Sequence, residues 1–362
     1  MSKTDKKKVV LYSILHWGLG HATRSIPVIK GLQTRGYEVI VCTDGKVVDF
    51  IKEEIAGIKV ELLPAYNIRY SSSSMVMNML LQLPKIYSAF ILEKVIFKKL
   101  VKKYSPTFCI SDNRYGCKNK IVPSFFLGHQ WNILDSKGNK HKLASKLNQY
   151  FISKFQQIII PDGNNSEFSG KLSKDIPKGF GIYVGILSRF TKTNFFTDHS
   201  KYDATIILSG PEPSRTNLEK NIISVLSGEK GKSFILVRGT NRKSESLSAE
   251  NIEVLNLVNS NQLSDIIDQS ACVISRSGYS SIMDYVRLGA KDLIFIPTKG
   301  QTEQEYLARY YNDKYSIAKI DEDNLDQLTE QLNKNRKPGL VEGESLGING
   351  LIDKIEKLVS LL

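Results

Sequence analysis

Short apolar runs alternate along this chain with segments of helical periodicity. The first half contains six such runs: VVLYSIL (9–15), EVIVCT (38–43), KVELLP (59–64), TFCISD (107–112), PSFFLGH (123–129) and QQIIIPD (156–162). After residue 200 come five more: DATIILSG (203–210), SFILVRG (233–239), IEVLNL (252–257), ACVISR (271–276) and DLIFIP (292–297). Alternation of this kind is typical of βαβ units, and near-continuous apolar strands fit parallel sheets that are covered on both faces. The pattern predicts an α/β fold with two doubly wound parallel sheets.

The two halves are predicted to be separate domains. A chain of 362 residues exceeds what one hydrophobic core usually fills. A segment that is first glycine-rich and then polar, residues 179–201, suits a hinge near residues 185–200. We therefore expect an N-terminal domain over residues 1–188 and a C-terminal domain over residues 189–345. Apolar residues at helical spacing in the tail predict an amphipathic helix over 346–362 that packs back toward the N-terminal domain.

Charge and composition narrow the classes of partner. The net charge of +13 indicates an anionic partner, although a general lysine bias would also account for part of it. No RNP, KH or zinc pattern accompanies the charge, so no nucleic-acid partner is expected. The four cysteines are scattered without ligand spacing, which predicts neither a disulfide framework nor a metal site. With no run of 18 apolar residues and no signal-type cleavage site, a cytoplasmic location is expected.

The loop after the first predicted strand carries the stretch HWGLGHATRS. Ligands of open parallel sheets bind beyond the carboxyl ends of the strands, and Gly18 and Gly20 would allow a tight turn and close approach to a ligand. His21, at the start of the next helix, is a candidate general base because its ordinary pKa lies close to neutral pH. Asp112 ends the run TFCISD and should emerge at the same edge, where it could orient His21. The alternative is that His21 only caps the helix.

A second pattern lies at residues 275–311, which predict strand, glycine turn, helix, strand, loop and helix. Gly278, Tyr279, Ser280 and Ser281 would offer backbone N–H groups and hydroxyls to a diphosphate at a helix N-terminus. Asp284, farther along the same helix, could accept hydrogen bonds from ribose hydroxyls.

The next predicted helix opens with two further candidates. Gln304 and Glu305 have side chains that could hold sugar hydroxyls. Each of these polar residues also has an ordinary alternative, Asp284 as a solvated helix residue and Gln304 and Glu305 as first-turn residues that complement the helix dipole.

Taken together, several segments resemble the MurG-like group of GT-B glycosyltransferases, which is UDP-sugar-dependent and family 28-like. They are HWGLGHATRS, ISDNRYG, LGHQWN, GILSR and SRSGYSSIMDYVRLG with IPTKGQTEQEY. The resemblance spans residues 9–320 and is most specific over 275–306. It implies a GT-B fold, in which two Rossmann-like domains face each other across a cleft. It also implies an inverting hexosyltransferase that needs no metal or cofactor and uses a UDP-sugar, with UDP-N-acetylglucosamine a candidate, as co-substrate.

The resemblance also assigns roles to single residues. It places Gly278–Ser281 at the diphosphate, Asp284 at the ribose, and Gln304 and Glu305 at the donor sugar. Arg189 matches an interdomain arginine that reaches the diphosphate, and it is grouped with Gly18 and Gly20 among the donor-binding positions.

On the acceptor side, His129 and Asn132 match an HxxN motif, and His21 with Asp112 matches the catalytic pair. The chain departs from the group's usual pattern at Gln130, where glutamate is common, and at the loop PEPSRT, where a GSQG-like turn is common. Its ribose-binding acid is aspartate rather than glutamate. These departures bear on whether the acceptor is a peptidoglycan precursor.

Residues 71–106 bear on the acceptor. Methionine and leucine cluster before Pro84, and lysines then recur every four residues near apolar positions. A basic amphipathic segment can lie on an anionic membrane at the inner face of the cell membrane, so a lipid-linked glycan or cell-envelope glycoconjugate is a candidate acceptor. The alternative is an ordinary helix packed on the sheet. A UDP-sugar hydrolase, a non-hydrolysing epimerase and a scaffold that binds without catalysis also remain open.

Overall fold

The computed structural model describes residues 8–66, 82–191, 200–210, 212–240, 249–334, 340, 342–343 and 345–361. The chain forms two compact units. Unit 1 comprises Met1–Leu134, Lys140–Arg189 and Glu342–Leu362, and unit 2 comprises Asp135–Asn139 and Phe190–Val341. Apart from the short stretch Asp135–Asn139, the chain passes from unit 1 to unit 2 after Arg189 and returns at Glu342.

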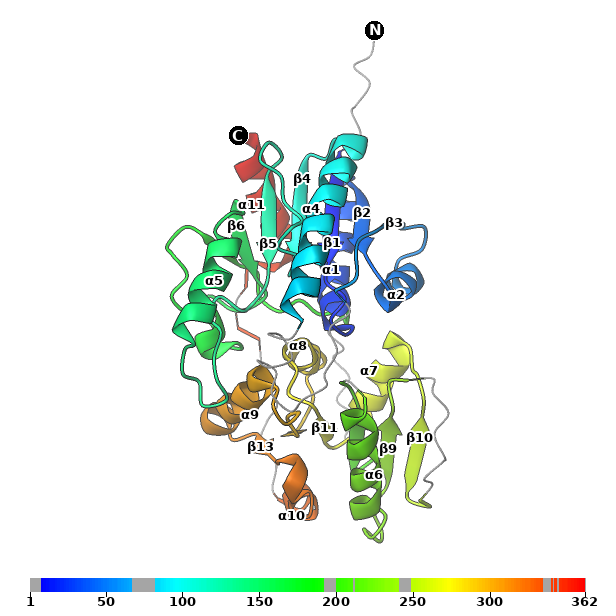
Figure 1. Ribbon diagram of the computed structural model, residues 1–362. Helices are drawn as coiled ribbons and strands as arrows, with labels where there is room; N and C mark the ends of the chain where they lie inside the picture. The colour runs from blue at the N-terminus through cyan, green and yellow to red at the C-terminus, as the bar shows by residue number, and fades with distance from the viewer. Residues whose placement is uncertain are drawn as a thin grey trace. The chain divides into compact units, whose positions relative to one another are not determined.

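Unit 1 is built on a seven-stranded parallel sheet of order β3-β2-β1-β4-β5-β6-β7 (Figure 1). Its strands are β1 Val9–Ile14, β2 Glu38–Thr43, β3 Lys59–Leu62, β4 Phe108–Asp112, β5 Ser124–Leu127, β6 Gln157–Ile160 and β7 Gly181–Tyr183. Its helices are α1 Gly20–Thr34, α2 Lys46–Glu54, α4 Leu83–Tyr104, α5 Lys142–Ile152 and α11 Gly347–Ser360, with the 3-10 turn η1 Gly170–Ser173.

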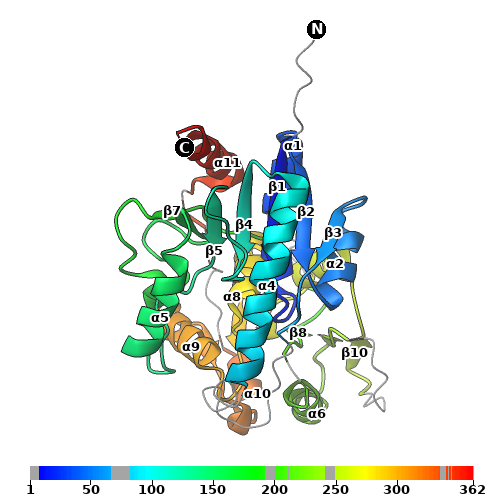
Figure 2. The same ribbon diagram turned by 45° about the horizontal axis from the view of Figure 1, so that its top comes forward.

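Both faces of this sheet are covered, and β1 shows how. Val10, Tyr12 and Ile14 pack in one cluster with α1 and α11, whereas Val9 and Leu11 pack in another cluster with α4. Successive strand residues point to opposite faces, so a strand that is buried on both sides must be apolar at nearly every position. Figure 2 shows α4 crossing one face of the strands, on the side away from α11.

The C-terminal helix packs on α1 of unit 1. Leu351, Ile352 and Ile355 are fully buried in the same cluster as β1 and α1. Gly31 of α1 permits this close approach, because a Cβ at Gly31 would lie 2.3 Å from a methyl carbon of Ile348.

Unit 2 is built on a six-stranded parallel sheet of order β10-β9-β8-β11-β12-β13. Its strands are β8 Ala204–Ile207, β9 Phe234–Val237, β10 Ile252–Leu255, β11 Val273–Ser275, β12 Leu293–Phe295 and β13 Ala318–Lys319. Its helices are α6 Ser214–Leu226, α7 Ser260–Asp268, α8 Tyr279–Leu288, α9 Thr302–Tyr315 and α10 Gln327–Leu332, with the 3-10 turn η2 Glu322–Asn324. The predicted α/β class with two parallel sheets is confirmed.

The sequence pattern missed two short strands, β7 and β13, which have three and two residues. β7 lies in the glycine-rich segment that the pattern assigned to the start of a linker. Most of the polar part of that segment, 192–199, lies outside the described residues, as do residues 67–81 of the predicted amphipathic stretch. Among the described helices, none combines the length and apolar character needed to cross a bilayer.

Candidate active site

The carboxyl edge of the unit 1 sheet positions the loop after β1. Ile14, the last residue of β1, pairs in register with Asp112, the last residue of β4. The chain then turns through Gly18, which has φ +77°, a left-handed conformation that disfavours other residues. Gly20 opens α1. The turn therefore delivers the first residues of α1 to the end of β4, as the sequence predicts.

His21 and Asp112 are in direct contact. His21 Nδ1 lies 2.7 Å from Asp112 Oδ1, the His21 side chain is 15% exposed and the Asp112 side chain is fully buried. Arg24 NH2, which can only donate, lies 2.9 Å from the same nitrogen. Because an ionised carboxylate only accepts hydrogen bonds, the shorter contact with Asp112 favours a proton on Nδ1 that is donated to Asp112. That tautomer leaves the lone pair on Nε2, the nitrogen that can take a proton from a substrate. The predicted pairing is confirmed as a contact, and the catalytic role stays a prediction.

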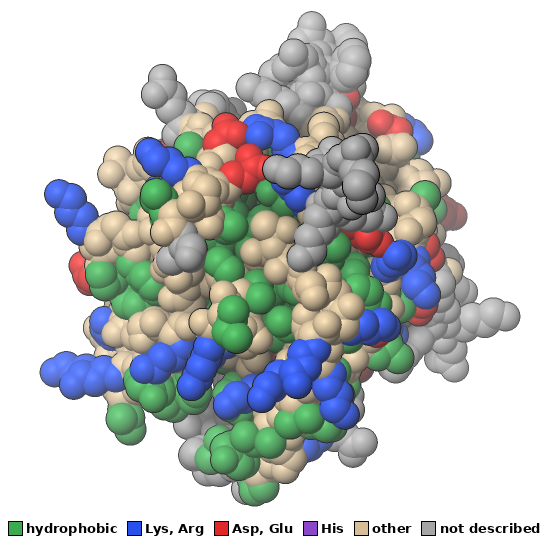
Figure 3. Space-filling model, turned by 90° about the horizontal axis from the view of Figure 1, so that it is seen from above, with side chains coloured by type: hydrophobic (Ala, Val, Ile, Leu, Met, Phe, Trp, Pro, Cys, Tyr) green, Lys and Arg blue, Asp and Glu red, His purple; other side chains and the backbone are tan. Residues whose placement is uncertain are grey.

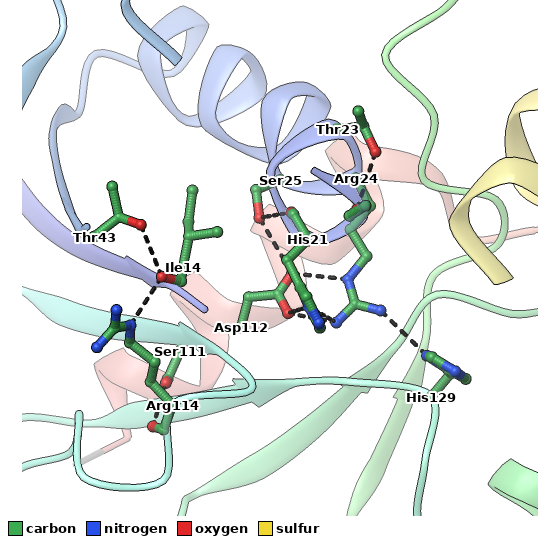
Figure 4. A network of polar contacts seen from close by, with 11 residues as sticks. Ile14, His21, Thr23, Arg24, Ser25, Thr43, Ser111, Asp112, Arg114 and His129 are labelled. Atoms are coloured by element: carbon green, nitrogen blue, oxygen red, sulfur yellow. Dashed lines mark hydrogen bonds and ion pairs between the residues drawn. The ribbon is translucent and has the colours of Figure 1, made fainter. Parts of the chain in front are cut away.

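Arg24 completes the group, and the sequence analysis did not identify it (Figure 4). Arg24 Nε donates to Asp112 Oδ2 at 2.7 Å and NH2 donates to Asp112 Oδ1, which makes a bidentate pair with both side chains buried. Its NH1 also lies 3.2 Å from His129 Nδ1. The signal that could have found it is spacing, because Arg24 follows His21 by three residues and therefore shares its face of α1.

The surroundings set the charge state of this group. Burial lowers the pKa of His21, and the Arg24 charge lowers it further against the opposing effect of Asp112. For Asp112, burial alone would raise the pKa, but the Arg24 and His21 charges and hydrogen bonds bring it down to about 2. At neutral pH the carboxylate is therefore ionised and the imidazole is neutral. This is the state that a general base requires.

The two predicted acceptor residues are placed differently. His129 lies just beyond β5, is buried, and contacts Arg24, so it belongs to the cluster around Asp112. Asn132 has its amide engaged elsewhere. Its Nδ2 donates to the carbonyls of Lys171 and Lys174 at 2.9 Å each, and its Oδ1 accepts from Gln149 at 3.0 Å.

Arg189 is the last residue of unit 1 before the chain enters unit 2. Its guanidinium lies over the ring of Phe50, 5.5 Å from the centroid, and its NH1 lies 3.7 Å from Glu54 Oε1. Both partners belong to α2. These contacts hold Arg189 against α2 in unit 1.

In unit 2, the glycine turn after β11 leads directly into α8. Gly278 is the N-cap residue and has no side chain with which to cap the helix. The start of α8 carries the partial positive charge of a helix N-terminus, which attracts phosphate. Asp284 is half-buried on the same helix, one turn after Ser280.

Buried Arg276, which the sequence analysis did not single out, braces this turn. It donates to the carbonyls of Ile296 at 3.0 Å and Pro297 at 3.2 Å and to Ser214 Oγ at 3.0 Å, and it pairs with Glu322. The loops that follow β11 and β12 are thereby tied to the start of α6 and to η2.

Gln304 and Glu305, the predicted donor-sugar residues, bond to the loop that precedes them. Gln304 Oε1 accepts from the Thr298 N–H at 2.9 Å, and its Nε2 donates to Gln301 Oε1 at 2.7 Å. Glu305 Oε1 accepts from the Gly300 N–H at 2.9 Å. In this conformation both side chains hold the loop that follows β12. Within the described ranges, no cluster of three or more His, Cys, Asp or Glu side chains is placed to hold a metal ion.

Comparisons with known proteins show what the chain is similar to. Residues 219–345 match the glycosyltransferase family 28 C-terminal domain. The chain is 25% identical to the UDP-N-acetylglucosamine–N-acetylmuramyl-(pentapeptide) pyrophosphoryl-undecaprenol N-acetylglucosamine transferase of Sulfurihydrogenibium sp. (strain YO3AOP1). This alignment of 303 residues covers 82% of this chain and 79% of the relative.

Among solved structures, the spinosyn forosaminyltransferase SpnP aligns with a TM-score of 0.64 at 13% identity, covering 98% of this chain and all of its own. The calicheamicin glycosyltransferase CalG4 aligns with the same score and identity over 91% of each chain. Their fold is the GT-B fold. The chain is a GT-B glycosyltransferase. The resemblance to MurG-like enzymes is confirmed, and the family match covers the part of the glycosyltransferase that contains the turn at Gly278, Asp284 and Gln304.

Proposed function

We propose that this glycosyltransferase transfers a sugar from a UDP-sugar to an acceptor hydroxyl, with inversion at the anomeric carbon and without a metal ion. The observation that carries the proposal is the 2.7 Å contact between His21 and Asp112. Arg24 binds the same carboxylate. A neutral imidazole that is held by an ionised carboxylate can accept a proton and stabilise the resulting charge.

The proposed reaction is one displacement. His21 Nε2 removes the proton of the acceptor hydroxyl while that oxygen attacks the anomeric carbon from the face opposite the diphosphate. The bond between the anomeric carbon and the diphosphate oxygen breaks, and UDP leaves with the electron pair. The backbone N–H groups of Tyr279 to Ser281 and the guanidinium of Arg189 would stabilise the charge on the leaving group.

The donor assignment rests on unit 2. The relative from Sulfurihydrogenibium is named for UDP-N-acetylglucosamine, and the family 28 match covers the start of α8. Asp284 would bind the ribose. We propose UDP-N-acetylglucosamine as the first donor to test.

The acceptor proposal rests on the surface of unit 1. Exposed apolar side chains gather on α4 and α5, which touch through the rings of Phe90 and Phe151 at 5.8 Å. They are Leu83, Tyr87, Ile91, Leu92 and Val95 on α4 and Leu143, Leu147 and Tyr150 on α5. Lysines lie among them, and the pKa of Lys118 falls to about 8 because of burial and the charges of Lys154 and Lys94.

Figure 3, a view of one face, shows Lys and Arg side chains beside hydrophobic ones along its lower margin. Apolar and basic side chains together favour the surface of an anionic membrane. We therefore propose a lipid-linked glycan or another cell-envelope glycoconjugate as acceptor, and a peripheral position at the inner face of the membrane.

A panel of nucleotide sugars tests the proposal. The purified enzyme is titrated with UDP-N-acetylglucosamine, UDP-glucose, a GDP-sugar and a dTDP-sugar by calorimetry. UDP-sugars should bind, and the GDP- and dTDP-sugars should bind at least about tenfold more weakly, because guanine is larger than uracil and dTDP lacks the ribose 2′-hydroxyl that Asp284 would bind. Products are then separated after incubation with anionic vesicles that contain extracted lipids. A glycosylated lipid supports the proposal, whereas free sugar plus UDP, or a changed sugar still attached to UDP, would point to a hydrolase or an epimerase.

A further inference from the structure

The loop that leads to His21 carries a second histidine with its own carboxylate. His16 Nδ1 lies 2.9 Å from Asp44 Oδ1, with the His16 side chain 30% exposed and the Asp44 side chain 9% exposed. Asp44 directly follows β2, just as Asp112 ends β4, and β1 lies between these two strands. As at His21, the carboxylate favours the proton on Nδ1 and leaves the lone pair on Nε2.

The His16 ring packs against Gly45. It has φ 58° and ψ −142°, a conformation that is open mainly to glycine. A Cβ at this position would lie 2.4 Å from His16 Nδ1 and Cε1, which no real contact allows. Both the backbone and the space beside it therefore exclude other residues.

A buried arginine holds the second oxygen of the Asp44 carboxylate. Arg114, which is fully buried, pairs with Asp44 Oδ2 and donates from NH1 to Glu93 Oε2 at 2.8 Å. Its Nε donates to the Ile14 carbonyl at 2.8 Å, at the end of β1. Burying these charges carries a desolvation penalty that apolar residues would avoid. An ordinary surface histidine does not require such a buried network of charges. The network therefore orients the His16 ring.

Trp17 follows His16 and is 37% exposed, whereas the other tryptophan, Trp131, is 6% exposed. A large aromatic side chain at the surface of a ligand-binding loop offers an apolar face beside polar partners. A pyranose ring has the matching character, because its C–H face is apolar and its hydroxyls project around the rim.

We propose that His16 and Trp17 form a subsite for the pyranose ring of a sugar acceptor. The ring packs on Trp17, and one of its hydroxyls donates to His16 Nε2, while His21 takes the proton of the hydroxyl that attacks. A pyranose carries several hydroxyls, so it can donate one to His16 Nε2 and present another to His21, whereas a simple aliphatic alcohol has only one. This inference rests on the proposed glycosyl transfer and names the residues that bind the sugar ring of the acceptor.

Tryptophan fluorescence tests the subsite without catalysis. Trp131→Phe leaves Trp17 as the sole tryptophan, and the matched variant Trp17→Phe leaves only Trp131. Each is titrated, below the micelle concentration, with octyl β-D-glucopyranoside, octyl β-D-galactopyranoside, octyl β-N-acetylglucosaminide and n-octanol. The Trp17 emission should change saturably with at least one glycoside and not with octanol, and the Trp131 emission should stay constant. No response to any glycoside, or an equal response to octanol, overturns the proposal.

Two substitutions at His16 test the hydrogen bond. His16→Asn keeps an N–H group for Asp44 but lacks an atom at the Nε2 position, whereas His16→Gln can place an amide oxygen there. In the Trp131→Phe background, we expect the asparagine variant to bind the responding glycoside about tenfold more weakly and the glutamine variant to stay within about threefold. Equal affinity in the asparagine variant and its parent, with unchanged melting temperature, would overturn the role of His16.

UDP-N-acetylglucosamine binding, measured on the same proteins, separates this inference from the proposed function. A glycoside response in a protein that binds no nucleotide sugar would retain the subsite and reject the transferase reaction. Normal donor binding with no glycoside response would reject the subsite and leave the proposed transferase reaction standing.

Discussion

The carboxyl edges of the two sheets differ in what their polar side chains hold. At the edge in unit 1, charged side chains bond to one another, so that Asp112 receives both Arg24 and His21. At the edge in unit 2, Gln304 and Glu305 bond to N–H groups of their own loop, and Arg276 donates to the carbonyls of Ile296 and Pro297. One edge organises side chains around a titratable ring, and at the other the side chains hold the backbone of the loops.

Under the proposed reaction, this difference divides the work between the two edges. Proton transfer needs one ring nitrogen in a fixed tautomer and direction, which side-chain partners provide. Binding of a diphosphate needs rigid N–H groups that point at it, which a braced loop provides. Substitutions at the two edges should therefore separate turnover from donor affinity.

The largest expected effect is at the first edge. We predict that His21→Ala lowers kcat by roughly 10² to 10⁴, because the acceptor hydroxyl loses its base, and leaves the affinity for UDP-sugar within about twofold. The measurements are UDP release under saturating substrates and calorimetry with the UDP-sugar. Near-normal kcat would remove His21 from the chemistry.

A smaller effect is expected at the second edge. Asp284→Ala should weaken the binding of UDP-sugar by roughly 10- to 100-fold, because a charge-assisted hydrogen bond to the ribose is lost. Asp284→Asn is the matched control and should lose less, since its amide oxygen still accepts. Calorimetry measures both affinities, and an unchanged dissociation constant in the alanine variant would reject the ribose role.

The smallest effect concerns pH. Because the pKa of His21 is lowered from its ordinary value of 6.5, kcat/KM should rise with pH through a midpoint below 6.5 and level off above it. Arg24→Met removes a charge that lowers this pKa, so the midpoint should move to higher pH. Arg24→Lys keeps the charge and should shift it less. Profiles of kcat/KM from about pH 4.5 to 8, with melting curves as a check of folding, measure this. The same midpoint in wild type and the methionine variant would contradict the electrostatic account.

Local pattern was enough to predict the sheets and the pairing of His21 with Asp112. The strands are apolar on both faces, as in EVIVCT, which is β2 residue for residue, and strand ends converge at one edge by topology. Strands β7 and β13 were not predicted, because a run of two or three residues is too short to show a periodic pattern.

Long-range pairing was less accessible to sequence reasoning. Arg114, Asp44 and Glu93 come from separate segments, and only the fold brings their charges together. The engaged amides of Asn132 and Gln304 could not be foreseen either, since a polar side chain in a motif looks the same whether it faces a ligand or a carbonyl.

The packing of α11 on α1 links the two ends of the polypeptide. The helix that carries the proposed base in its first turn is held near its other end by α11, where Gly31 faces Ile348 and Ile352 and Arg35 pairs with Asp353. Leu351, Ile352 and Ile355 are fully buried there. Fully burying such side chains contributes roughly 1.5 to 3 kcal/mol each. Loss of the last sixteen residues would therefore expose part of the core beneath α1, and a deletion more than three hundred residues from His21 in sequence would lower the stability of the unit that carries it.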